Sequence, residues 1–155
     1  MAVTSVYFDA ALVAKFYVNE PGRDAVRALA REMGRVVTSG VAVAEVSPAF
    51  HRKLWEGAVD HDVFEALMGQ FEQDLEGGLW YLAGPSEEIF RQVHAFFATL
   101  DGTVFVRSLD ALHLITARSE GFARVYSNDR HFLGACAHAN LEGIDPVASQ
   151  RQSHR

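Results

Sequence analysis

Residues 3–18 read VTSVYFDAALVAKFYV, a stretch that holds one acidic residue, Asp9, among apolar neighbours. The apolar run VYF before Asp9 is typical of a buried β-strand, and the alanine- and leucine-rich run after it is typical of a helix. A strand followed by a helix is the unit from which α/β folds are built. Asp9 therefore falls at the carboxyl end of the first strand, the edge at which open α/β sheets bind their ligands.

The rest of the chain continues this alternation. After residues 3–8, strand-like runs lie at 35–38, 79–83 and 123–126, with a weaker one at 144–147. Helical patterns lie between most of them: segment 21–34 has proline in its first turn and ends at glycine, and segment 60–78 begins at Asp60, a residue suited to capping, and ends at paired glycines. We predict a three-layer α/β fold, in which helices flank a central, mainly parallel sheet of four to five strands.

Length and composition indicate one packed domain. The chain has 155 residues, of which 49% are apolar and 22% charged, a balance typical of globular proteins. We expect a domain at residues 1–147 and a flexible tail at 148–155, because the tail is polar and lacks any helix or strand pattern. The apolar runs are shorter than the roughly 18 residues of a membrane span, and no secretory signal is visible, so we expect a cytoplasmic protein without membrane contact.

Charge and cysteine content exclude further classes. The single cysteine, Cys136, cannot form an internal disulfide or a multi-cysteine zinc site. The net charge of -6 argues against a surface coated with nucleic-acid-binding charge. Any contact with nucleic acid is therefore expected to be local or assisted by a metal ion.

Four acidic residues share one kind of setting. Asp9 and Asp129 follow strand-like runs, whereas Glu45 and Asp110 lie in the first turns of expected helices and have apolar neighbours on both sides. Acids in such places commonly cap helices, and capping alone remains an alternative for each of the four. Because all four map to the same edge of the predicted sheet, a shared pocket explains them better than four separate caps.

A cluster of four carboxylates needs positive charge nearby. Two carboxylates a few ångströms apart repel by about 4 kcal/mol at an effective dielectric constant near 20, so the cluster stays ionised only with cations present. Oxygen ligands favour Mg²⁺ or Mn²⁺ over zinc or copper. Such a site suits the hydrolysis of a phosphodiester bond by a water molecule that the metal activates.

Four segments, in this order, give the chain a resemblance to a known family. They are VYFDAALVAKFYVNEPG at residues 6–22, VVTSGVAVAEV at 36–46, RSLDALHLITA at 107–117 and VYSNDRHF at 125–132. Together they resemble the PIN domain and, within that family, the VapC-like toxins of bacterial toxin–antitoxin pairs. The resemblance runs from about residue 3 to residue 145.

The resemblance implies a function and a set of partners. It implies that Asp9, Glu45, Asp110 and Asp129 bind the metal of a Mg²⁺- or Mn²⁺-dependent endoribonuclease, with Ser127 and Asn128 beside them as supporting residues. It also implies a homodimer, an RNA substrate and a small cognate antitoxin that occupies the groove of the active site. We expect that antitoxin to send a basic arm into the acidic pocket and to dock on the helices around residues 41–56 and 60–77.

The chain departs from the usual pattern of this family at three places. Ala10 and Ala11 replace the threonine and serine that usually follow the first aspartate, which removes hydroxyls that could support a ligand. Ser127 stands where threonine is frequent and keeps one hydroxyl. His131 stands where a further acid is common, so Asp129 is the only acid in its segment. These departures leave open an alternative function, a PIN-fold module that binds a protein or RNA without cutting it.

Other chemistries fit the residues less well. Haloacid-dehalogenase-type phosphatases need an aspartate at the position of Ala11, and response-regulator receivers need an acidic pair and a late lysine that are not evident. His51 and His113 have no second histidine at metal-binding spacing, which favours packed or surface roles. No serine shows a paired base, so a serine nucleophile is not expected. Lys15 and Arg107 are the candidates for contact with RNA phosphates, with a solvated charge as the alternative for each.

Overall fold

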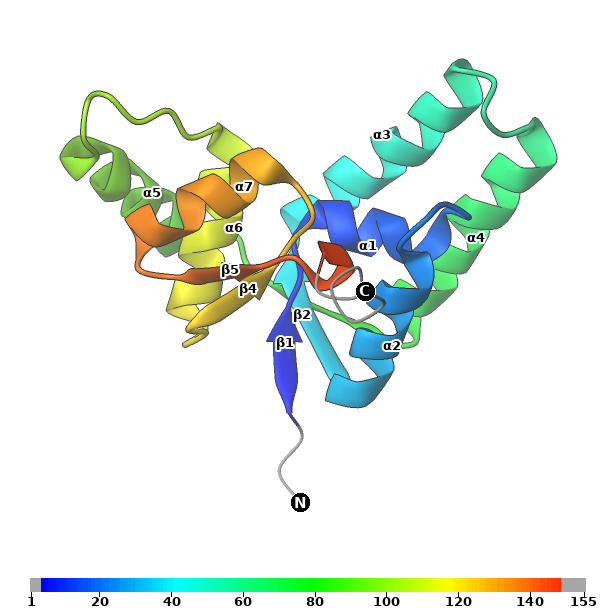
Figure 1. Ribbon diagram of the computed structural model, residues 1–155, viewed down its shortest axis with the longest axis horizontal. Coiled ribbons are helices and arrows are strands. Elements are labelled where there is room, and N and C mark those ends of the chain that lie inside the picture. The colour runs from blue at the N-terminus through cyan, green and yellow to red at the C-terminus, as the bar shows by residue number, and fades with distance from the viewer. Residues whose placement is uncertain (1–3, 149–155) are drawn as a thin grey trace.

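The computed structural model describes residues 4–148, so Val3 and most of the expected tail lie outside the described residues. The elements, in chain order, are β1 (Ser5–Tyr7), α1 (Ala10–Tyr17), α2 (Arg23–Met33), β2 (Arg35–Ser39), α3 (Val41–Trp55), α4 (His61–Glu76), β3 (Trp80–Ala83), α5 (Glu87–Thr99), α6 (Ser108–Ser119), β4 (Arg124–Tyr126), α7 (Arg130–Ala135), the 3₁₀ helix η1 (Cys136–Ala139) and β5 (Glu142–Ile144). Figure 1 shows the α3–α4 hairpin and the α5–α7 helices on opposite sides of the strands. The predicted α/β fold with helices flanking parallel strands is confirmed.

The strands form two small parallel sheets rather than one sheet of four to five strands. The first sheet has the order β1-β2-β3, and the second pairs β4 with β5. A single parallel bridge between Phe8 and Tyr126 joins them where the chain leaves β1. The strands beside this bridge have three residues each, so the ladder does not continue across it.

The last strand begins two residues earlier than the sequence predicts. It ends at Ile144, whereas the prediction placed it at residues 144–147. Asp145 accepts hydrogen bonds from the backbone N–H groups of Val147 and Ala148, and Pro146 has no N–H to give to a ladder. A turn therefore replaces the extended backbone that the apolar residues had indicated.

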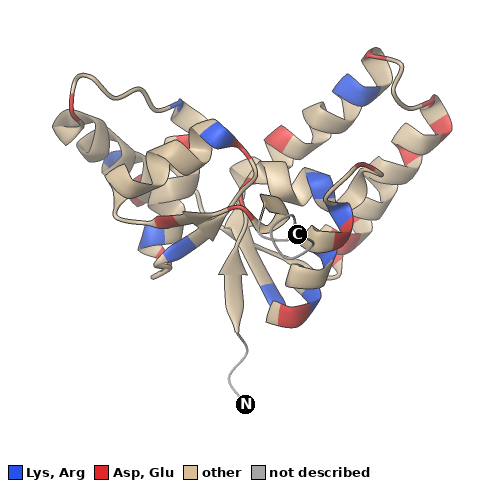
Figure 2. Ribbon diagram, in the orientation of Figure 1, with Lys and Arg blue, Asp and Glu red and all other residues tan. Residues whose placement is uncertain are grey.

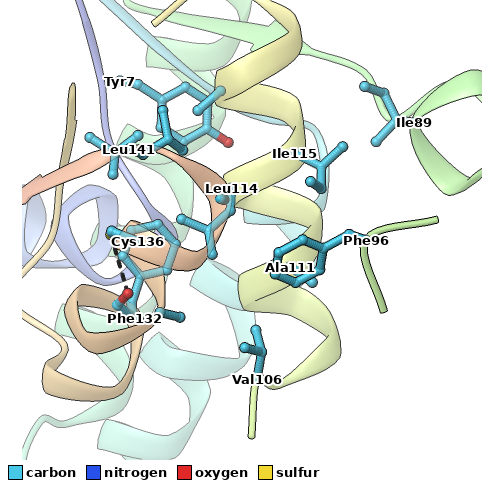
Figure 3. Packing of buried hydrophobic residues seen from close by; sticks show 14 of the residues in the cluster. Tyr7, Ile89, Phe96, Val106, Ala111, Leu114, Ile115, Phe132, Cys136 and Leu141 are labelled. Atoms are coloured by element: carbon cyan, nitrogen blue, oxygen red, sulfur yellow. Dashed lines mark hydrogen bonds between the residues drawn. The ribbon is translucent and has the colours of Figure 1, made fainter. Parts of the chain in front are cut away.

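Alternating strand residues supply two separate cores. In β1, Val6 faces the core beneath α1–α4, whereas Tyr7 faces the core beneath α5–α7. Val36 and Val37 of β2 divide in the same way, as the two-residue period of a strand requires. Figure 3 shows the second core, in which Tyr7, Leu114 and Phe132 pack around α6. Both faces are apolar, so helices cover both.

The helix boundaries follow local capping chemistry. Asp60 caps α4 by accepting a hydrogen bond from Val63 N–H at 2.9 Å, as predicted. Helix α2 ends at Gly34 as predicted, but Pro21 lies ahead of its first turn, because Gly22, with φ of 97°, makes the turn that begins the helix. No helix among the described residues is both long and apolar enough to cross a membrane.

Candidate active site

The four acidic residues lie on separate elements that meet at the carboxyl ends of β1 and β4. Asp9 caps α1 directly after β1, and Asp129 caps α7 shortly after β4. Glu45 lies in the first half of α3, and Asp110 lies in the first turn of α6. Figure 2 shows acidic positions in the first half of α3 and directly before α7, on the two sides of the middle of the molecule.

All four acids line one pocket of about 290 Å³. The lining residues are Asp9, Ala10, Ala11, Glu45, Arg107, Ser108, Leu109, Asp110, His113 and Asp129. The structure therefore brings the predicted acids together with Arg107, the predicted phosphate contact. It also adds His113, for which the sequence favoured a packed or surface role.

Asp9 is both a helix cap and a member of the pocket. One carboxylate oxygen accepts a hydrogen bond from Leu12 N–H at 3.1 Å, and the other accepts one from the Ser127 hydroxyl. Burial raises the pKa of Asp9 to about 6, although the Ser127 hydrogen bond partly opposes this rise. Ser127 thus supplies support that the hydroxyl-free Ala10 and Ala11 cannot give.

Arg107 bridges two of the four acids. Its Nε donates to Asp110 at 2.7 Å, and its Nη2 donates to Asp129 at 2.6 Å. Burial would raise the pKa of Asp129, but hydrogen bonds from Arg107 and from backbone N–H groups outweigh it, so that pKa lies below its ordinary value. The Arg107 side chain is 43% exposed, so water reaches the bridge and weakens it. Arg107 is therefore a cation within the pocket that can also turn outward.

Glu45 is held by a buried histidine. His113 Nε2 lies 2.8 Å from Glu45 Oε1, and His113 Nδ1 lies 2.8 Å from the Tyr7 hydroxyl. The interpretation of His113 as a packed residue was incomplete, because its ring is buried and also reaches the pocket. The spacing of His113 three residues after Asp110 was the available signal, since such residues share one face of a helix.

Two other predicted site residues lie apart from this pocket. Lys15 donates hydrogen bonds to Glu20 at 3.0 Å and to the Pro21 carbonyl at 3.2 Å, and it is not part of the pocket lining. Asn128 is half-buried between Ser127 and Asp129 and is also outside the lining. Of the two predicted phosphate contacts, only Arg107 therefore reaches the pocket.

The donor set suits a hard cation, although the carboxylates are turned toward protein groups. Each of the four acids has an oxygen that accepts a hydrogen bond from Leu12, Ser127, Arg107, His113 or a backbone N–H of α7. Within residues 4–148, no three His, Cys, Asp or Glu side chains lie close enough together to hold a metal. The all-oxygen donors fit Mg²⁺ or Mn²⁺, provided that Arg107 moves and the carboxylates turn inward.

The chain belongs to the PIN domain family, which it matches over residues 6–137. This range contains all four acids of the pocket. The family resemblance predicted from the four sequence segments is thereby confirmed. A comparison with curated proteins found no match.

Two solved structures share this fold. One is the crystal structure of VapC20 from Mycobacterium tuberculosis, a sarcin–ricin loop cleaving toxin, with 15% identity, a TM-score of 0.64 and coverage of 84% of this chain and 94% of that one. The other is FitAcB from Neisseria gonorrhoeae, with 17% identity, a TM-score of 0.64 and coverage of 91% of this chain and 97% of that one. At these identities the comparison shows a common fold.

Proposed function

We propose that this protein is a divalent-metal-dependent endoribonuclease and the toxin of a toxin–antitoxin pair. The observation that carries the proposal is the pocket itself, in which Asp9, Glu45, Asp110 and Asp129 converge at the carboxyl ends of parallel strands in a PIN fold. The likeness to VapC20, a toxin that cleaves the sarcin–ricin loop, supports RNA as the substrate class. We further propose that the protein acts in the cytoplasm, where it would meet both RNA and a cognate antitoxin.

The residues of the pocket would have different roles in the reaction. The four carboxylates would hold Mg²⁺ or Mn²⁺, which supplies a Lewis acid that activates water and offsets charge on the phosphate. Ser127 would keep Asp9 oriented through its hydroxyl, and Asn128, the next residue in the chain, would support this segment from outside the pocket lining. Arg107, once released from Asp110 and Asp129, lies at the pocket with its guanidinium available for a phosphate oxygen.

A second candidate function is binding without cleavage. The bridge from Arg107 to Asp110 and Asp129 favours it, because the pocket already contains a cation that satisfies two of its acids. An interaction module would need no further ion. The four converging carboxylates favour the nuclease. Like charges that lie close together repel, and a module that only binds a partner would gain nothing from this repulsion.

Cleavage of RNA by the pure protein tests the two candidates. The nuclease predicts discrete cut ends in total RNA when Mg²⁺ or Mn²⁺ is present and intact RNA when a chelator replaces the metal. Sequencing of those ends would also identify the target. The interaction module predicts that the RNA stays intact under every metal condition while a partner still binds.

The Arg107 bridge leads to a prediction with two opposite effects. Arg107→Gln should tighten Mn²⁺ binding about fivefold, because two partly exposed ion pairs that compete with the metal together contribute on the order of 1 kcal/mol. The same change should slow RNA cleavage at saturating Mn²⁺, because a phosphate contact is lost. Calorimetric titration with Mn²⁺ and a cleavage assay measure the two effects, with Arg118→Gln on the far end of α6 as the control. Unchanged Mn²⁺ affinity in Arg107→Gln would show that Arg107 does not compete with the metal for Asp110 and Asp129.

The proposed antitoxin has a suitable surface beside the pocket. A groove of about 790 Å³ runs between α3 and α4 and is lined by Ser47, Pro48, His51, Arg52, Trp55, Phe64 and Met68. Trp55 is 79% exposed at the far end of α3, whereas Glu45 points into the acidic pocket from the near end. Ten helical residues span about 15 Å, so an apolar helix in the groove could carry a short basic arm into the pocket.

Substitution in the groove tests this partner surface. Trp55→Asp should weaken binding of the antitoxin at least tenfold, because it removes an aromatic anchor and places a charge in an apolar groove. The antitoxin, purified with the protein from its native host, would be titrated against wild type and variant. Binding of its basic arm should also weaken as Mg²⁺ or salt rises. A partner that is insensitive to metal and docks away from the four acids would contradict the proposal.

We also propose a homodimer, as the family resemblance implies. Large apolar side chains are exposed on the edge strand β3 and on α5, namely Tyr81, Leu82, Phe90 and Phe97. Exposed aromatic groups of this kind are typical of protein interfaces.

A further inference from the structure

A chain of buried polar groups leads from β1 to the acidic pocket. The Tyr7 hydroxyl on β1 contacts His113 Nδ1 on α6, and His113 Nε2 contacts Glu45 Oε1 on α3, each at 2.8 Å. Tyr7 and His113 are almost completely buried, and both belong to the side of the molecule packed around α6. Packing alone would be served by phenylalanine and leucine, which would leave no polar atoms to satisfy.

The hydrogen-bond partners fix where the proton of His113 lies. An ionised carboxylate can only accept, so Nε2 must carry a proton and donate it to Glu45. In the neutral ring Nδ1 then accepts from the Tyr7 hydroxyl. The ring is therefore set as the tautomer protonated on Nε2.

Aromatic contacts also fix the orientation of the ring. The His113 ring packs edge-on against Tyr7, with centroids 6.0 Å apart, and against Phe132, with centroids 6.3 Å apart. Glutamate has three rotatable side-chain bonds, and ordering them on binding a metal has an entropic cost. A rigid donor that orders Glu45 in advance lowers the cost of recruiting it as a ligand.

We propose that His113 and Tyr7 are positioning residues that hold Glu45 by its Oε1 and so leave its Oε2 to bind a divalent metal. The inference rests on the proposed function of the pocket and extends it to two residues that no carboxylate pattern identifies. Neither residue touches substrate or metal in this role. His113 acts through Glu45, and Tyr7 acts through the tautomer of His113.

Nuclear magnetic resonance of the ring nitrogens tests the first half of the proposal. In wild-type protein without added metal, the ¹⁵N shifts of His113 should show a proton on Nε2. Tyr7→Phe, which removes one oxygen atom and keeps the ring, should allow a mixture of the two neutral tautomers. A His113 ring protonated on Nδ1 alone in wild type would overturn the proposal, whatever metal the protein binds.

Mn²⁺ titration tests the second half. Tyr7→Phe should weaken Mn²⁺ binding several-fold, and His113→Leu should weaken it by about 10–100-fold, the range typical of groups that orient a ligand. His113→Gln, whose amide can donate near the Nε2 position, should restore most of the affinity. This rescue keeps the test valid if His113→Leu fails to fold.

Tyr17→Phe is the matched control. Tyr17 is also a buried tyrosine, donating to Asp74 at 2.6 Å and accepting from Trp80 at 2.6 Å, but it lies in the other core, away from the pocket. It should lose stability without losing Mn²⁺ affinity. Equal Mn²⁺ affinity of wild type, Tyr7→Phe and His113→Leu would overturn this inference alone, whereas a wild-type protein that binds no Mn²⁺ would overturn the proposed function as well.

Discussion

Asp110→Asn is expected to reduce metal-dependent RNA cleavage by at least about 100-fold. The change removes one negative charge and one strong oxygen ligand from the pocket, and a 100-fold loss corresponds to roughly 3 kcal/mol of transition-state stabilisation. We expect the fold to stay intact, because relief of repulsion among the acids offsets the loss of the 2.7 Å hydrogen bond from Arg107. Cleavage rates of wild type and variant at saturating Mn²⁺ measure the effect.

Asp101→Asn is the matched control for this prediction. Asp101 is an exposed aspartate in the turn between α5 and α6, where it accepts hydrogen bonds from the backbone N–H and hydroxyl of Thr103. Its substitution should leave cleavage unchanged, because it lies outside the pocket lining. If Asp110→Asn cleaved RNA as fast as wild type at saturating Mn²⁺, the carboxylate site could not be the site of the reaction.

Asp9→Asn is expected to stabilise the metal-free protein at neutral pH. The pKa of Asp9 rises from 3.8 to about 6 on folding, chiefly through burial, so the folded protein holds this proton more tightly than the unfolded chain. Between about pH 4 and pH 6 the residue therefore lowers the free energy of unfolding as pH rises. The full effect, present above pH 6, is on the order of 3 kcal/mol. Asparagine carries no charge at any pH, so the variant does not lose this stability.

The pH dependence separates this effect from simple loss of a helix cap. The difference in unfolding free energy between variant and wild type should be near zero at pH 4 and should favour the variant at pH 7.5, as measured by urea unfolding without metal. Each kcal/mol corresponds to roughly 2–4 °C in Tm for a chain of this size. A variant that is less stable by the same amount at both pH values would show that Asp9 acts only as a cap for α1.

The positions of the four acids could be predicted because strand ends and helix starts converge in parallel α/β folds. Asp9 and Asp129 followed apolar runs, and Asp110 opened a helix, so local pattern placed each at the same edge. Capping and site membership proved compatible rather than exclusive. One oxygen of Asp9 caps α1, whereas the other accepts from Ser127.

The contacts among these acids could not be predicted, because they depend on long-range geometry. Helical spacing relates Arg107 to Asp110, but only the fold brings Asp129 to the same guanidinium. Likewise, the pattern of β1 shows that Tyr7 is buried but not that its hydroxyl meets His113, 106 residues away. The error in the position of β5 had a local cause. The apolar residues at 144–147 indicated a strand, although Asp145 makes a turn there.

The central claim is that a divalent metal binds among these four carboxylates, and anomalous diffraction from a crystal soaked in Mn²⁺ tests it most directly. We predict an anomalous peak within roughly 2.0–2.3 Å of oxygens from at least three of Asp9, Glu45, Asp110 and Asp129, with Arg107 turned away from Asp110 and Asp129. The peak should be absent from Asp110→Asn and present in Asp101→Asn. The claim would be contradicted if the protein cleaves RNA in solution but its crystals, soaked in saturating Mn²⁺, show no anomalous peak in the pocket.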